Sequence, residues 1–149
     1  MSTVAGDQPR FFTVEEANRT LPLVRRIVKD IVQSYPQLQQ QTEQLHQLAS
    51  PGIGTELEPR IDELRGQIDR NSERINGFIR ELEQIGCYFK GFEEGLVDFY
   101  SLYKGKPVFL CWKFDEKKIS HWHEVESGFS GRQPITAEFA EEIRRALPS

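Results

Sequence analysis

Two histidines stand two residues apart in the stretch ISHWHEVESGFSGR, residues 119–132 of a 149-residue chain. In an extended strand, residues i and i+2 point to the same face, so His121 and His123 would present two imidazole nitrogens toward one point. Imidazole binds zinc and similar divalent ions, which need one or two further ligands. The pair therefore raises the hypothesis of a metal site.

Further ligands for such a site have no diagnostic spacing. Candidate carboxylates lie in the segment FEEGLVDF and beside the histidines, and they are Glu93, Glu94, Asp98, Glu124 and Glu126. Cys111 is a fainter candidate, as a thiol ligand or nucleophile. Buried imidazoles need hydrogen-bond partners whether or not a metal is bound. The pattern therefore favours a hydrogen-bonded cluster of histidine and aromatic side chains, Trp112 among them, over a divalent metal such as zinc.

Asp98 interrupts the otherwise apolar segment GLVDFYSLY. A buried aspartate needs a cation or several donors, and Arg132 or a histidine could serve; the alternative is an exposed face of a half-buried strand. Arg132 ends the glycine-rich stretch SGFSGRQP, which could hold a carboxylate or phosphate. More commonly, such an arginine ties down a neighbouring acidic side chain. The candidate ligand-binding residues are Asp98, Trp112, Glu124 and Arg132.

The elements that position these residues begin with a helical hairpin, expected over residues 13–86. In two segments, 24–48 and 61–85, apolar residues alternate spacings of three and four, and they pair in order if the chain folds back at 50–54. Gly86 is placed to end the second helix. Capping boxes at the two helix starts are Thr13 with Glu16 and Thr55 with Glu58.

Several residues of this hairpin depart from a simple pattern. Pro36 should kink or break the first helix. Ser34, Gln41 and Asn71 place polar side chains in the seam, where they favour fixing the register over forming a polar pocket. Beside the seam, apolar residues broaden the face of the first helix, so that the C-terminal half or a second copy must cover it; they are Val28, Val32 and Tyr35.

The segment 87–126 is rich in aromatic and β-branched residues and predicts an antiparallel β-meander. Strands are expected near 87–90, 96–102, 107–114 and 118–125. A turn at Glu116–Lys117 would set Trp112 opposite His121 and Leu110 opposite His123, with both histidines on the apolar face. A one-residue bulge would reverse this assignment.

The fold class is therefore α+β, a long antiparallel helical hairpin with a small β-meander and a short C-terminal helix. We expect a single domain, with a disordered tail over 1–10 and a loop and helix, capped by Thr136, over 127–149. The net charge of −4 disfavours nucleic acid and anionic membranes as partners. No apolar run reaches transmembrane length, and a cytoplasmic location is expected. We expect Cys87 and Cys111 to be reduced thiols, and the alternative is a single disulfide between them.

Five motifs occur in a characteristic order along the chain. They are FTVEEANRTLP, GLVDF, LCWKF, HWHE and GFSGRQPI. Together they resemble an uncharacterised prokaryotic family, domain of unknown function 2203, from about Phe11 to Ile135. The resemblance implies a single-domain bacterial cytoplasmic protein, and it assigns no catalytic or ligand residue.

Two functional hypotheses follow from these features. The first is a non-catalytic interaction or scaffold module whose polar cluster serves structure or binds a small ligand. Its expected partners are a second copy of the chain, as a homodimer, or another protein. The long helical arm and the lack of a recognised catalytic set favour it. The alternative is a metal-dependent enzyme, hydrolytic in type, with His121 and His123 as metal ligands, a carboxylate completing the site and Arg132 orienting an anionic substrate.

Overall fold

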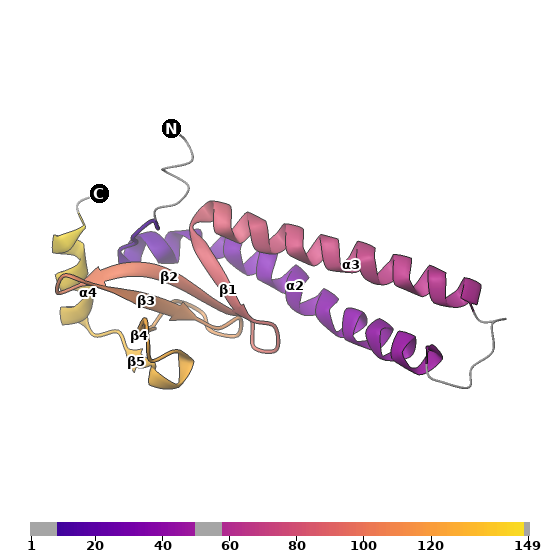
Figure 1. Cartoon of the computed structure of the whole chain (residues 1–149). Helices are drawn as coiled ribbons and strands as arrows, with labels where there is room; N and C mark the ends of the chain where they lie inside the picture. Colours follow the sequence, from indigo (N-terminus) through magenta and orange to yellow (C-terminus); the bar gives the residue numbers. More distant parts are fainter. Residues whose placement is uncertain (1–8, 50–57, 148–149) are drawn as a thin grey trace.

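The computed structural model of the chain describes residues 9–49 and 58–147. Within them it has the predicted α+β fold: two long packed helices, an antiparallel sheet and a short C-terminal helix (Figure 1). The helices are α2 (Val14–Leu48), α3 (Glu58–Ile85) and α4 (Ala137–Ala146), with a 3-10 turn, η2, at Phe129–Gly131. The strands lie side by side in chain order, and they are β1 (Cys87–Gly91), β2 (Leu96–Tyr103), β3 (Lys106–Trp112), β4 (His121–Glu124) and β5 (Gln133–Pro134). Only β5 is not among the strands that the sequence predicts.

Helix α2 begins where the sequence predicts. The Thr13 hydroxyl accepts a hydrogen bond from the Glu16 N–H at 3.0 Å, and the Glu16 carboxylate accepts one from the Thr13 N–H at 3.0 Å, which completes the capping box. The alternative of a break at Pro36 is wrong, because α2 continues through this residue. Proline removes one backbone donor, and tertiary packing compensates beside it, where the rings of Tyr35 and Phe92 stack at 4.3 Å.

Helix α3 carries Pro59 in its first turn and stops before Gly86, as predicted. Gly86 has a φ of +114°, and a Cβ at this position would lie 3.1 Å from the Phe12 ring. Glycine is therefore suited both to the conformation and to the close approach. The predicted capping box of Thr55 with Glu58 involves a residue outside the described ranges.

The two helices form the predicted hairpin, and its far half projects away from the sheet (Figure 1). Polar side chains bridge the helices midway along. Asn71 Nδ2 donates a hydrogen bond to Gln41 Oε1 at 2.6 Å, and Gln41 Nε2 donates one to Gln67 Oε1 at 3.3 Å. Hydrogen bonds between side chains across a seam are typical of residues that fix the register of two helices.

One face of the sheet packs on the near half of α2 and on α4. Phe99 meets Phe12 edge-on at 5.2 Å, and Trp122 stacks on Phe139 at 4.5 Å. The buried residues of this face include Val97, Phe99, Leu110, Trp112 and Trp122, and those of the helices include Val24, Val28, Ile31 and Ile143. The C-terminal half also covers the broad apolar face of α2, since Gly95 lies against Val28 and Val32 while Phe92 covers Tyr35.

The register of β3 with β4 differs by one residue from the expected one. His121 pairs with Cys111, and His123 pairs with Phe109. The prediction that Trp112 lies opposite His121, with the histidines on the core face, is therefore wrong. The reason is that residues 113–120 form a wide loop rather than a tight turn at Glu116–Lys117, so the alternation of faces is reversed.

Both cysteines of the chain are free and buried, which excludes the alternative of a disulfide between Cys87 and Cys111. In the described parts of the chain, no helix is both long enough and apolar enough to span a membrane.

Candidate metal centre

The sheet face turned away from the helical core carries a band of polar and aromatic side chains. Because faces alternate along each strand, two rows of paired residues share this side. Asp98, Cys111 and His121 are neighbours in one row. Tyr100, Phe109 and His123 form the next row. Three adjacent strands, β2, β3 and β4, therefore bring together side chains that are far apart in the sequence.

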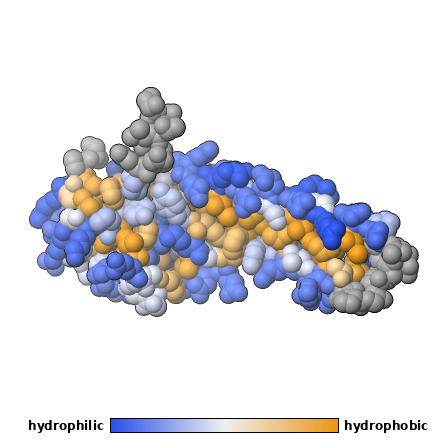
Figure 2. Space-filling view, viewed as in Figure 1, coloured by the Kyte–Doolittle hydropathy of each residue, from blue (hydrophilic) through white to orange (hydrophobic). Residues whose placement is uncertain are grey.

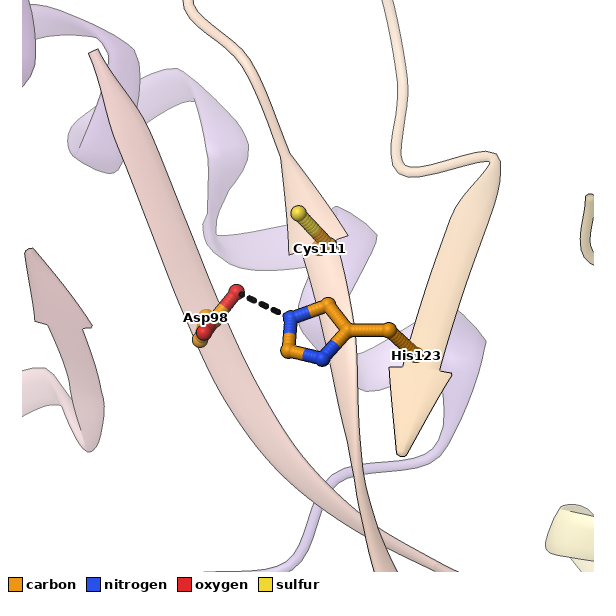
Figure 3. A group of neighbouring side chains, drawn as sticks. All are labelled: Asp98, Cys111 and His123. Carbon is orange, nitrogen blue, oxygen red and sulfur yellow. Dashed lines mark hydrogen bonds and ion pairs between the residues drawn. The ribbon is translucent and has the colours of Figure 1, made fainter. Parts of the chain in front are cut away.

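Asp98, Cys111 and His123, here called the buried centre, gather within this band (Figure 3). One potential metal-ligating atom from each lies within 4.8 Å of the other two. The residues are 4%, 1% and 3% exposed, respectively. An oxygen, a sulfur and a nitrogen donor thus converge in a site that is closed to bulk solvent.

His123 is held by two contacts on opposite sides of its ring. Nδ1 lies 2.8 Å from the backbone carbonyl of Glu124, and Nε2 lies 3.3 Å from Asp98 Oδ1. A carbonyl oxygen only accepts hydrogen bonds, so the Nδ1 contact requires the proton on Nδ1. Nε2 then faces the Asp98 carboxyl group, and the contact needs either a proton or a cation between the two atoms. Metal-ligating histidines commonly have this arrangement, with the distal N–H donated to a carbonyl.

Asp98 has a second partner besides His123. Lys90 Nζ lies 3.4 Å from Asp98 Oδ2, and the same ammonium lies 4.5 Å from the centre of the Phe109 ring. The aspartate side chain is 6% exposed, whereas that of Lys90 is 44% exposed. A buried carboxylate needs a compensating positive charge, and in this structure Lys90 contributes one from the solvent side.

The Cys111 thiol is inert in this environment. Burial, together with the charge of the neighbouring Asp98 carboxylate, raises the pKa of Cys111 to about 12. Since the thiolate is the reactive form, such a cysteine is a poor free nucleophile. A bound metal would replace the thiol proton and use the sulfur as a ligand.

A second polar cluster lies next to the buried centre. Arg132 Nη2 donates hydrogen bonds to Glu116 Oε1 at 2.8 Å and to the Cys111 carbonyl at 3.2 Å. Burial opposes ionisation of Glu116, but bonds from Arg132 and from the Lys113 N–H outweigh it and lower the pKa of this carboxyl. His121 Nδ1 lies 3.7 Å from Glu116 Oε2. Arg132 thus ties down a neighbouring acidic group, as the commoner reading of its loop predicts.

The wide loop 113–120 is anchored by α2. The Arg25 guanidinium donates to the carbonyls of Phe114, Glu116 and Lys117 at 3.4, 3.1 and 2.9 Å. Trp112 Nε1 also donates to the Glu116 carbonyl, at 2.9 Å. These contacts hold Glu116 where it meets Arg132, and they explain why the strands do not close in a short turn.

The candidates named from the sequence are distributed over several places. Asp98 and His123 meet in the buried centre, and His121 lies in the adjacent cluster with Arg132. Trp112 is buried on the opposite face. The side chain of Glu124 is outside the centre, which it contacts only through its carbonyl. The other carboxylate candidates are exposed, and they are Glu93, Glu94 and Glu126.

The sequence points only faintly to Cys111 and gives no sign of Lys90 or Glu116. Cys111 lies two residues before Lys113, in a strand that is otherwise apolar. Whether its thiol faces Asp98 therefore depends on the register in which that strand pairs with its neighbours. Lys90 comes from the edge strand β1, and its contact with Asp98 could be inferred only from the pairing of Tyr88 with Asp98. The sequence predicts a turn at Glu116, and an acidic residue in a turn gives no sign of a buried ion pair.

Comparison with protein families gives a match to the model of a family described as an uncharacterised conserved protein (DUF2203), over residues 10–135. The match includes every residue of the buried centre and of the adjacent cluster. Comparisons with the curated proteins and with the solved structures find no match.

Proposed function

This chain belongs to the DUF2203 family of uncharacterised conserved proteins, and we propose that it binds one divalent transition-metal ion, best matched by zinc, at Asp98, Cys111 and His123. The observation that carries the proposal is the convergence of three donor atoms of different chemistry within 4.8 Å in a buried site. Charged and polar groups are costly to bury without partners, and a metal ion would satisfy all three at once.

The donor set favours zinc over harder ions. Thiolate and imidazole ligands suit zinc, whereas magnesium and calcium prefer oxygen donors alone. In a tetrahedral zinc site with bonds of about 2.0–2.3 Å, ligand atoms lie roughly 3.3–3.8 Å apart. Side-chain torsions would therefore need to draw the widest pair of atoms together by at most about 1.5 Å.

Three protein ligands leave one position of a tetrahedral ion open. This is the arrangement of catalytic zinc, while structural zinc has four protein ligands. The alternative function, a metal-dependent hydrolytic enzyme, is therefore compatible with this site. Its ligands would be Asp98, Cys111 and His123, whereas His121 would belong to the adjacent cluster and not bind the metal.

Elemental analysis of protein purified without a histidine tag tests the proposal. We expect zinc in a one-to-one ratio to the chain, and a loss of that zinc in His123→Ala and Cys111→Ser. Cys87→Ser is the matched control, because Cys87 is also a buried free thiol but lies outside the centre. Absence of metal, together with an unchanged melting temperature on adding zinc, would reject the proposal.

A second candidate function is an interaction module, and the far half of the hairpin favours it. There, the seam residues of both helices remain only half-buried, among them Leu38, Leu45, Leu48, Ile61 and Ile68. An apolar stripe runs along the hairpin between hydrophilic flanks (Figure 2). A second hairpin packed on this stripe would give a four-helix arrangement. Light scattering on the untagged chain tests this role.

A further inference from the structure

A small cleft opens on the solvent side of the buried centre. It has a volume of about 270 Å³ and is lined by Pro9, Tyr88, Lys90, Tyr100 and Phe109. Two of these residues also touch the centre: Lys90 Nζ is 3.4 Å from Asp98 Oδ2, and the Phe109 ring lies 5.5 Å from the His123 ring. The cleft therefore adjoins the buried centre, with the side chains of Lys90 and Phe109 between the two.

The walls of the cleft are aromatic. The rings of Tyr88 and Tyr100 meet edge-on at 5.7 Å, and those of Tyr100 and Phe109 are tilted at 4.5 Å. Lys90 adds an ammonium group above Phe109. A single positive charge beside aromatic rings and phenolic hydroxyls suits a carboxylate attached to an apolar body.

Lys90 and a metal ion would contact different oxygens of Asp98, since Lys90 Nζ is 3.4 Å from Oδ2 and the His123 ring faces Oδ1 at 3.3 Å. A metal ion would draw on the same negative charge and so weaken the attraction between Asp98 and the ammonium group. Lys90 is the group that can move, since its side chain is 44% exposed and its strand is at the edge of the sheet. The ammonium of Lys90 has three donors and also lines the cleft, so it can bind an anion there when Asp98 holds a metal.

We infer that the cleft binds a small organic carboxylate that occupies the open metal position, with its apolar body against Tyr100 and Phe109 and Lys90 as its ionic partner. This inference rests on the proposed metal site. It adds a ligand class, and it gives Lys90 two roles: counter-ion of Asp98 in the metal-free protein, and carboxylate-binding residue in the metal-bound protein.

Cobalt substitution tests the inference, because Co²⁺ replaces zinc and its visible absorption responds to each ligand. A near-ultraviolet charge-transfer band that disappears in Cys111→Ser would report the sulfur ligand. Benzoate and acetate are then titrated into the cobalt protein. We expect both to change the visible bands, and benzoate to bind more tightly because its ring contacts the aromatic walls.

Variants of Lys90 test whether its ammonium group binds the carboxylate. Lys90→Met should weaken benzoate binding by about tenfold or more, the scale of one hydrogen bond to a charged group. Lys90→Arg should largely restore it, and Lys106→Met, at the exposed first residue of β3, should leave it unchanged. Two results would overturn the inference while leaving the metal site intact. One is a cobalt spectrum that does not change when benzoate or acetate is added, and the other is an equal benzoate affinity in the wild type and in Lys90→Met. A chain that binds no cobalt would overturn both.

Discussion

Single side chains decide what the buried centre can do. The Glu124 carbonyl fixes the Nδ1 proton of His123 and so aims Nε2 at Asp98. Asp98 in turn lies between His123 and Lys90. In the metal-free protein, the aspartate is thus the anion on which two basic groups depend.

Asp98→Asn should therefore destabilise the metal-free protein. Asparagine keeps the size of the side chain but removes the charge that Lys90 and His123 contact. We expect a loss of about 1.5–3 kcal/mol in the free energy of unfolding, the usual worth of hydrogen bonds to charged groups. Urea denaturation in the presence of a chelator measures it.

Asp115→Asn is the control for this change, since it makes the same substitution at an exposed position. It should alter stability by less than about 0.5 kcal/mol, as surface substitutions usually do. Equal stabilities of the two variants would show that Asp98 carries no special interaction.

Among the elements, the loop 113–120 links α2 to the polar face of the sheet. Its backbone carbonyls accept hydrogen bonds from Arg25 of the helix, and its Glu116 carboxylate contacts Arg132 and His121. The length and anchoring of this loop set the register of β4, and therefore which face His123 occupies.

Glu116→Gln should weaken this anchoring in a pH-dependent manner. The pKa of Glu116 is lower in the folded protein than in the unfolded chain, so its carboxylate stabilises the fold above about pH 4.5 and stops doing so as the pH falls through the folded value. We expect the variant to be less stable than the wild type by about 1.5–3 kcal/mol at neutral pH.

This difference should narrow as the pH falls from about 4.5 through the lower pKa of Glu116 in the folded protein, below which both proteins carry an uncharged group. Denaturation series at several pH values measure it, with Glu126→Gln as the control at an exposed glutamate. A stability difference that stays constant from neutral to acidic pH would contradict the role assigned to the Glu116 charge.

The sequence correctly predicts those elements whose signals are local. The capping box of Thr13, the stop at Gly86 and the spacing of seam residues all predict the hairpin correctly, because each depends on residues within a few positions. The facing of His121 and His123 could not be predicted in the same way. It depends on Arg25, which is about ninety residues distant in the chain from the carbonyls it binds.

At the scale of the whole molecule, the sheet and the near half of the hairpin share one core, and the far half of the hairpin lies beyond it (Figure 1). Asp98 was recognisable as unusual in an apolar strand, and its pairing with a histidine was one of the predicted solutions. Cys111 lies beside Asp98 because of the registers in which β2, β3 and β4 pair. These registers depend on residues far apart in the chain, so the local sequence around Cys111 does not predict its place in the centre.

The projecting half of the hairpin predicts self-association. If two chains pair through the half-buried stripe, light scattering should give the mass of a dimer at micromolar concentration. Leu45→Glu, which places a charge in that stripe, should shift the mass to that of a monomer, and Gln40→Glu, at an exposed position of the same helix, should not. A monomer mass at every concentration tested would count against a homodimer.

X-ray absorption at the zinc edge, on untagged protein loaded with one equivalent of zinc, examines the metal site most directly. The account predicts a first shell with a single sulfur neighbour, from Cys111, and with nitrogen and oxygen neighbours for the rest. A shell without sulfur, or zinc that passes freely through a desalting column, would contradict it.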